Sequence, residues 1–294
     1  MGRFLIDVPA GSTLTGWRYE YNFVSINRVK PSTLEEFERE VADRESILKS
    51  AINERTKESM LLDSVEAEKD TKILVSWKEK STTDELAISA YRWANGSRFL
   101  FEKTVDKDKK DKGMTAMSDV LSHLRPRQDT DIPAQPGYCF GDGLIADPNW
   151  HDEEATVAID IGGHPDAYIV VTIDPFASYR HEKPLLERIG DLPKVLGELS
   201  SSVRLLRMGN RKIGSHKGQE YLLAAFDSGM RAQVFVWETQ GEGTVDTPSI
   251  KIEMTTGRED SNGNPQQTSL TDKQAVKMWD EILKSLRVQP QQAM

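Results

Sequence analysis

The two halves of this chain repeat one pattern, and this repetition constrains the fold more than any other feature of the sequence. Each half opens with a short apolar motif that contains glycine: Gly2-Arg3-Phe4-Leu5-Ile6-Asp7-Val8-Pro9 in the first, and Gly137-Tyr138-Cys139-Phe140-Gly141-Asp142-Gly143-Leu144-Ile145 in the second. In both halves alternating strands follow, then a Lys-Pro pair before a Leu/Glu-rich stretch, further strands and a closing amphipathic helix. The pattern predicts two similar lobes in tandem.

Length and composition agree with two globular lobes. The chain has 294 residues, enough for two domains that each bury a core, and its 37% hydrophobic and 29% charged residues are typical of a globular protein. A net charge of −9 argues against nucleic acid, whose phosphates require Lys and Arg, and against anionic membrane surfaces. No stretch approaches the roughly 20 apolar residues that span a bilayer. We therefore expect no direct membrane insertion.

The start of the chain and its cysteine bear on the compartment. Met1-Gly2-Arg3 runs straight into the strand-like Phe4-Leu5-Ile6, without a signal peptide. Leading residues usually fray, so we expect that Met1 replaces a removed leader. The single Cys139 has no partner within the chain. It is either a small buried apolar residue or the partner of a cysteine upstream of Gly2 that was lost with the leader.

The first half contains clear strand, helix and turn signals. Apolar side chains alternate with polar ones in one predicted strand, at Trp17, Tyr19, Tyr21 and Phe23. A Ser/Thr cap at residues 32–33, with Glu three positions later, predicts a helix start. The apolar face of that helix consists of Leu34, Phe37, Val41, Leu48 and Ile52. Asn95-Gly96 predicts a tight type I′ hairpin turn. The closing helix has the apolar stripe Met114, Met117, Leu121 and Leu124.

A linker and a similar second half follow. Residues 125–137 hold three prolines and no apolar period, so we place a linker at 127–136, between an N-terminal lobe at 1–126 and a C-terminal lobe at 137–294. In the second lobe strands are predicted near 203–208, 220–226, 233–238 and 250–254. A helical face is outlined by Leu185, Ile189, Leu192, Val195 and Leu199. A second capping box at residues 271–274 begins the last helix.

The order of these elements predicts the fold class. Strands adjacent in sequence and joined by short turns pair in antiparallel fashion, and a doubly wound parallel sheet would need a helix between nearly every two strands. We therefore expect an α+β protein of two structurally similar lobes, each a mainly antiparallel sheet packed with helices, produced by internal duplication. Strand positions predict core roles for Trp17, Trp77, Trp93 and Trp237.

Motifs for catalysis or cofactor binding are missing from the sequence. It has no Gly-x-Ser-x-Gly elbow, phosphate loop or Gly-x-Gly-x-x-Gly, so no nucleotide cofactor is indicated. The densest group of potential metal ligands is Asp142, Asp147, His151, Asp152, Glu153 and Glu154. Its spacing matches no Ca²⁺ loop, and Asp147-Pro148-Asn149-Trp150 is typical of a turn. We predict no metal site, no cofactor and no enzymatic activity.

Two exposed segments are candidates for binding a partner. One is Trp150 with its neighbours His151, Asp152 and Glu153, because tryptophan often anchors interfaces. The other is the mixed-charge run at 106–112, with Lys107, Lys109 and Lys110. A charge run is more often a solvated loop, and this simpler interpretation stays open.

The two opening motifs resemble the signatures of type VI secretion immunity proteins paired with lipase effectors, in the two-domain family cognate to the fourth lipase class. The resemblance spans nearly the whole chain and implies two related α+β lobes, a secretion leader and a periplasmic location. It also implies a monomer that forms a heterodimer with its cognate phospholipase effector and occludes the active site or lid of that enzyme.

Two other functions remain compatible with the sequence. An effector chaperone of a secretion system would hold the apolar segments of a toxin inside the producing cell, and cytoplasmic fractionation would favour it. A hydrolase would use Cys139 or the Asp142–Glu154 cluster. Esterase activity that disappears with Cys139→Ser or with a chelator would favour this third function.

Overall fold

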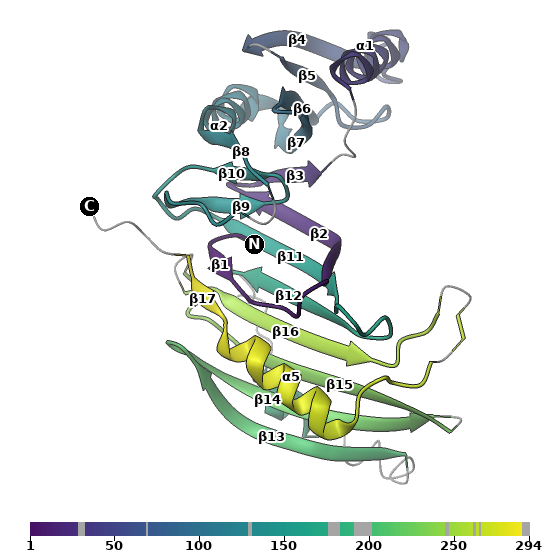
Figure 1. Ribbon diagram of the computed structural model, residues 1–294. Helices are drawn as coiled ribbons and strands as arrows, with labels where there is room; N and C mark the ends of the chain where they lie inside the picture. The colour runs from purple at the N-terminus through teal and green to yellow at the C-terminus, as the bar shows by residue number, and fades with distance from the viewer. Residues whose placement is uncertain are drawn as a thin grey trace. The chain divides into compact units, whose positions relative to one another are not determined.

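The computed structural model describes residues 1–28, 33–68, 70–128, 131–175, 183–190, 202–227, 229–244, 247–260, 263–264 and 266–289 (Figure 1). Its contacts divide the chain into two compact units. Unit 1 comprises residues 1–17 and 153–289, and unit 2 comprises residues 18–152. In the described chain no helix is both long and apolar enough to cross a membrane.

Unit 2 is built on an antiparallel sheet with two helices. Its elements are the later part of β2 (Thr13–Tyr21), β3 (Val24–Arg28), α1 (Leu34–Ser50), β4 (Leu61–Glu68), β5 (Thr71–Trp77), β6 (Glu85–Ala94), β7 (Ser97–Asp106), η1 (Lys107–Lys109), α2 (Lys110–His123), β8 (Leu124–Pro126), β9 (Tyr138–Phe140) and β10 (Gly143–Ile145). The strands of the sheet are ordered β2-β3-β7-β6-β5-β4, and β8-β10-β9 form a small second sheet.

Several local predictions for this unit are confirmed. Thr33 caps α1 and forms a capping box with Glu36. Asn95 and Gly96 both have positive φ, as a type I′ turn requires, and they join β6 to β7. The face of α1 is buried at Phe37, Val41 and Leu48. Leu34, the first residue of the helix, is exposed, and Ile52, also exposed, lies beyond its last residue, Ser50.

Two aromatic positions differ from the strand pattern. The structure ends β2 at Tyr21, and Phe23 lies in the turn to β3 with its side chain 58% exposed. The alternation continued past the end of the strand, so the sequence pattern placed the ring wrongly. Trp17 is also exposed rather than in the core, and Trp93 is only partly buried, whereas Trp77 and Trp237 are buried as predicted.

The motif that opens the second half of the sequence belongs to the core of unit 2. Its hairpin pairs β9 with β10, and all their apolar side chains are buried. The Phe140 ring meets the rings of Tyr19, Phe99 and Phe101 at centroid distances of 5.8–6.2 Å. A Cβ at Gly143 would lie 2.2 Å from this ring, so only glycine fits there. Cys139 is buried in the same hairpin, as expected for a small apolar residue.

Unit 1 has the same kind of architecture. Its elements are β1 (Phe4–Leu5), the first part of β2, β11 (Glu153–Asp160), β12 (Tyr168–Asp174), α3 (Leu185–Ile189), β13 (Val203–Ile213), β14 (His216–Asp227), β15 (Met230–Thr239), β16 (Ser249–Thr256), α5 (Asp272–Lys284) and β17 (Arg287–Val288). Helix α5 lies along the sheet of β13–β16 (Figure 1). Its buried Trp279 packs edge-on against Phe235, and the predicted capping box at Thr271 and Gln274 is confirmed.

The two units share one strand order. In unit 1 the strands run β11-β12-β16-β15-β14-β13, and in unit 2 they run β2-β3-β7-β6-β5-β4. Counted from the first strand of each set, both orders are first, second, sixth, fifth, fourth and third. All strand pairs with a described register are antiparallel. The predicted α+β class with mainly antiparallel sheets is therefore confirmed.

The opening motif of the chain closes unit 1 rather than unit 2. Strand β1 pairs with β17, which follows α5, and the Gln289 backbone N–H donates to the carbonyl of Arg3 at 2.8 Å. The Arg3 guanidinium makes a bidentate contact with the Glu153 carboxylate at 2.7–2.9 Å, and both side chains are buried. This ion pair joins the N-terminal segment to the start of β11.

The buried Arg3–Glu153 pair is predicted to be essential for the stability of unit 1. Glu153→Gln removes the negative charge that the buried guanidinium contacts, and breaking such a pair costs about 3–5 kcal/mol of unfolding free energy. A matched control is Glu281→Gln, because Glu281 pairs with Lys277 where both side chains are more than two-thirds exposed. That surface pair contributes little. Chemical denaturation measures both variants, and equal small losses contradict the prediction.

Candidate partner-binding site

The candidate loop 147–152 in unit 2 is organised around one buried carboxylate. Asp147 accepts hydrogen bonds on Oδ1 from the backbone and side chain of Asn149, at 2.9 and 3.0 Å. On Oδ2 it accepts one from the Tyr21 hydroxyl at 2.9 Å, and Nε2 of His151 lies 2.8 Å away. Because the carboxylate is an acceptor, that ring nitrogen carries a proton. The His151 ring also packs against Tyr21, with centroids 5.2 Å apart.

These contacts determine the charge of Asp147. Burial alone would raise its pKa, but the hydrogen bonds from the Asn149 backbone, Tyr21 and His151 outweigh it, so the pKa lies below its usual value. An ionised carboxylate with this many donors holds the loop in one conformation. The loop that carries Trp150 is therefore preorganised.

The structure gives the four predicted loop residues different surroundings. Trp150, His151 and Asp152 are partly exposed, and Asp152 accepts a hydrogen bond on its backbone carbonyl from the Asn22 N–H at 2.7 Å. Glu153 is buried against Arg3, so its carboxylate supports the fold and is closed to a partner. Sequence reasoning missed the central role of Asp147, which it placed among possible metal ligands. The Asp147-Pro148-Asn149 turn was the available signal.

The three predicted lysines lie at the other end of α2. Lys107 lies over the Trp77 ring at 5.1 Å, Lys109 pairs with Asp106, and Lys110 donates to Asp63 at 2.9 Å. The contact with Lys110 lowers the pKa of Asp63. Lys107 and Lys109 precede α2, and Lys110 is its first residue. The last residue of the helix is His123, whose backbone carbonyl accepts a hydrogen bond from the N–H of Ala146, the residue before the loop 147–152. Fourteen helical residues span about 20 Å, so the structure does not bring the two candidate segments together.

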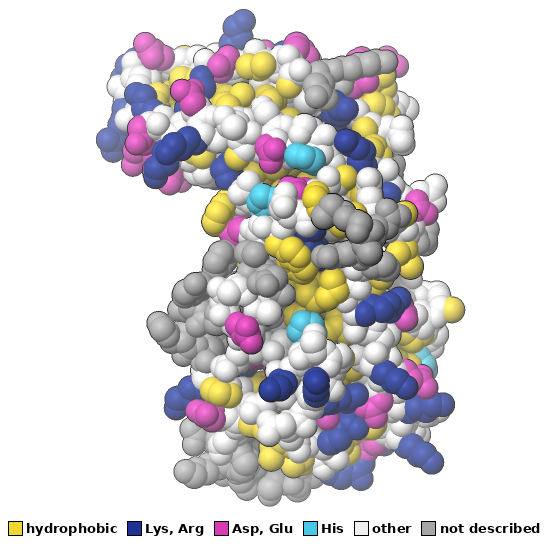
Figure 2. All heavy atoms as spheres, turned by 90° about the vertical axis from the view of Figure 1, so that its left-hand side faces the viewer, with side chains coloured by type: hydrophobic (Ala, Val, Ile, Leu, Met, Phe, Trp, Pro, Cys, Tyr) yellow, Lys and Arg dark blue, Asp and Glu magenta, His cyan; other side chains and the backbone are white. Residues whose placement is uncertain are grey.

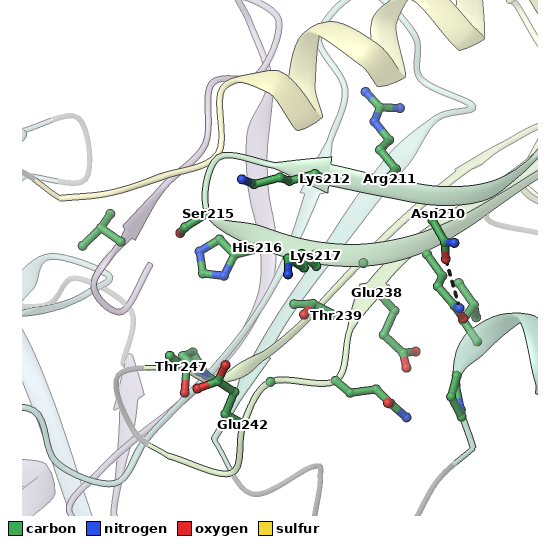
Figure 3. Close-up of a pocket in the computed structure, with 18 residues that line it drawn as sticks. Asn210, Arg211, Lys212, Ser215, His216, Lys217, Glu238, Thr239, Glu242 and Thr247 are labelled. Carbon is green, nitrogen blue, oxygen red and sulfur yellow. Dashed lines mark hydrogen bonds between the residues drawn. The ribbon is translucent and has the colours of Figure 1, made fainter.

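Unit 1 contains a cavity. A cavity of about 980 Å³ opens beside the β13–β14 hairpin, between α3 and the segment after β15 (Figure 3). Its labelled side chains include His216, Ser215 and Lys217. Burial lowers the pKa of His216, so this imidazole is neutral at pH 7. In the described chain no hydrogen bond is marked between Ser215 and His216 (Figure 3).

Charges of both signs share one face of the molecule (Figure 2), and the cysteine considered as a possible nucleophile is buried. Figure 2 shows basic and acidic side chains intermixed on one face, with hydrophobic ones between them. Cys139 is only 2% exposed, which closes it to substrates. Among the described residues no group of three or more His, Cys, Asp or Glu is placed to hold a metal ion. Two carboxylates of the Asp142–Glu154 segment make structural contacts: Asp147 with Tyr21, Asn149 and His151, and Glu153 with Arg3.

The hydrogen bonds of Asp147 predict a pH-dependent contribution to stability. Because the folded pKa is lowered, this contribution is complete above the unfolded pKa of about 4 and is lost as the pH falls further. Asp147→Asn is expected to lower the unfolding free energy by about 1–3 kcal/mol at pH 7 and by less near pH 3. Urea unfolding at both pH values measures this difference.

The control for this prediction is Asp43→Asn, on the exposed side of α1. It should leave stability nearly unchanged at both pH values. An equal loss for Asp147→Asn at pH 7 and pH 3 would show that the ionised carboxylate is not the stabilising species.

Comparisons with solved structures show a close likeness over nearly the whole chain. One chain of the crystal structure of a Tle4–Tli4 complex superposes with a TM-score of 0.86 at 25% identity, with 99% of this chain and 96% of that chain covered. The apo structure of the type VI secretion immunity protein TplEi from Pseudomonas aeruginosa gives 0.85 at 25% identity, with the same coverage. TplEi complexed with an "L" peptide gives 0.78 at 26% identity, covering 98% and 96%.

Comparisons of sequence point to the same family. None of the curated proteins compared with the chain matches it. The model of the N-terminal domain of Tle cognate immunity protein 4 matches residues 1–128, and the model of its C-terminal domain matches residues 131–291. The expectation of a type VI secretion immunity protein, rather than an enzyme, is thereby confirmed. The chain belongs to the two-domain family of Tle cognate immunity protein 4.

Proposed function

We propose that this chain binds its cognate antibacterial phospholipase effector, delivered by type VI secretion, and inhibits it stoichiometrically by occluding the active site or lid. The observation that carries the proposal is the match of both family models, which together span residues 1–128 and 131–291. Support comes from the likeness to a chain in the Tle4–Tli4 complex over 99% of this chain. A heterodimer of one immunity protein and one effector follows from this proposal.

Inhibition of this kind requires surface complementarity and no reacting groups. Stable complexes bury about 1,600 Å² in total, and a few desolvated anchors supply most of the affinity. The preorganised loop around Asp147 fits that requirement, because an ordered loop loses little conformational entropy on binding. The acidic and basic side chains are intermixed on the surface (Figure 2). Such a pattern favours electrostatic complementarity with one partner over general attraction to polyanions.

Our proposed contact region comprises Trp150, His151 and Asp152, with Lys107, Lys109 and Lys110 as a separate second region. Glu153 follows this region directly in the sequence, and its carboxylate pairs with Arg3 within unit 1. The identical strand orders of units 1 and 2 support an origin by internal duplication. The family models, at residues 1–128 and 131–291, support two tandem domains that meet within the predicted linker 127–136, whereas the compact units of the fold divide at 17/18 and 152/153.

A periplasmic location is the second part of the proposal. An immunity protein protects only in the compartment where its toxin acts. Family membership supports the periplasm, where an incoming phospholipase meets the membrane. Fractionation of cells that express the full-length gene product tests this location. Recovery in the cytoplasm alone would favour an effector chaperone.

The proposed function predicts capture of a silent lipase. The tagged chain, used as bait in lysate of its own host, is expected to retain a phospholipase that is inactive in the complex and active after separation. Titration of the freed enzyme with the purified chain should end at about one equivalent. A captured toxin that is active while bound would indicate a chaperone, and an eluate without lipase would contradict the proposal.

The contact region predicts a specific loss of inhibition. Changing Trp150, His151 and Asp152 together to alanine is expected to weaken binding of the freed lipase by about 30-fold or more, as for the loss of an interface anchor. Glu281→Gln is the control, because Glu281 lies on exposed α5 surface of unit 1. Inhibition at full strength by a folded triple variant would place the interface elsewhere.

A further inference from the structure

The turn between β2 and β3 has an unusual residue at its tip. The closing pair of the hairpin is Tyr21 and Val24, so its two-residue loop is Asn22-Phe23. Both loop residues have positive φ, +51° and +59°. This geometry is that of a type I′ turn, in which glycine is favoured at the second position.

A second hairpin in unit 2 shows the ordinary solution to the same geometry. Its closing pair is Ala94 and Ser97, and its loop is Asn95-Gly96 with φ of +50° and +78°. At the equivalent position the first hairpin carries Phe23 instead of glycine. A bulky side chain in the left-handed region is a steric outlier, and outliers of this kind persist only where the surroundings enforce them.

The surroundings of Phe23 do enforce its conformation. The Lys103 ammonium donates to the carbonyls of Asn22 and Phe23, at 3.0 and 3.1 Å, and lies 5.3 Å from the centre of the Phe23 ring. Burial lowers the pKa of Lys103, which indicates that the ammonium is partly withdrawn from water. Tyr21 and Val24, on either side of the turn, are both fully buried. The tip is therefore held by Lys103 and by the two buried residues that flank it.

The fixed ring is nevertheless presented to solvent. Phe23 is 58% exposed. Burial of its ring would ordinarily supply the free energy that offsets a strained backbone, and here most of that burial is missing. The Asn22 N–H donates to the carbonyl of Asp152 at 2.7 Å, which places the tip beside the Trp150–Asp152 loop. An exposed aromatic ring, a strained backbone and a candidate binding loop therefore coincide in one part of unit 2.

We propose that Phe23 is an anchor residue that inserts into an apolar recess on the cognate lipase effector. This inference rests on the proposed function and assigns the turn to its interface. The partner surface is apolar because the ring offers no polar atom, and an enzyme that acts on lipids must have apolar recesses for its substrate. A ring already held in place loses little freedom on binding, as the best interface anchors do.

The decisive variant is Phe23→Gly, which keeps the turn and removes the ring. It is expected to weaken binding of the purified lipase by about 30-fold or more in calorimetric titration. The midpoint of thermal unfolding should stay unchanged or rise by up to about 3 °C, because glycine tolerates the turn geometry. Phe23→Trp, which preserves an aromatic anchor, should bind within about threefold of the unmodified chain.

The matched control is Ile47→Ala on α1, since Ile47 is also 58% exposed. It should leave affinity unchanged. If the unmodified chain neither binds nor inhibits the lipase, the proposed function fails. If the unmodified chain binds and Phe23→Gly binds equally well, only the anchor role is overturned. A drop in thermal stability for Phe23→Gly would also overturn it, because the ring would then serve the fold.

Discussion

The pairing of the two ends of the described chain is the constraint on which unit 1 depends. Strand β1 is bound by β17, and the Arg3 side chain reaches Glu153 at the start of β11. These contacts join residues separated by about 150 to 290 positions, and such non-local contacts slow folding because loop closure precedes them. In the described chain β17 is the strand that pairs with β1, and Arg3 is buried once this unit has closed.

The same constraint explains why the compact units do not follow the sequence order of the two halves. The motif at 2–9 opens the first half but is packed in unit 1, whereas the motif at 137–145 opens the second half and packs in unit 2 against β8. Each opening motif thus meets the strand that follows a closing helix. Both motifs therefore contribute buried residues to their units, Arg3 and Phe4 in unit 1 and the strands β9 and β10 in unit 2.

Signals that act over a few residues could be predicted from the sequence, whereas contacts over long separations could not. The capping boxes at Thr33 and Thr271 and the Asn95-Gly96 turn follow from local backbone chemistry. Glu153 looked exposed because its nearest neighbours in sequence are acidic, yet its partner is 150 residues away. The position of Phe23 was mistaken because a period-two pattern does not mark where a strand ends. The contact role of Trp150 stays a prediction, since exposure depends on the folded loop.

The two hairpin turns of unit 2, Asn22-Phe23 and Asn95-Gly96, have the same backbone geometry but different residues at the second position. Both turns have the same backbone geometry, so the demand for a residue that accepts positive φ is the same at Phe23 and at Gly96. At the Asn95-Gly96 turn, glycine meets this requirement without further contacts. At the other turn a lysine must hold both carbonyls and the ring in place, which adds a partly buried cation to an already strained backbone. Folding alone does not account for this arrangement, because glycine in place of Phe23 would make the lysine contacts unnecessary. An interaction of the exposed ring with a partner protein does account for it.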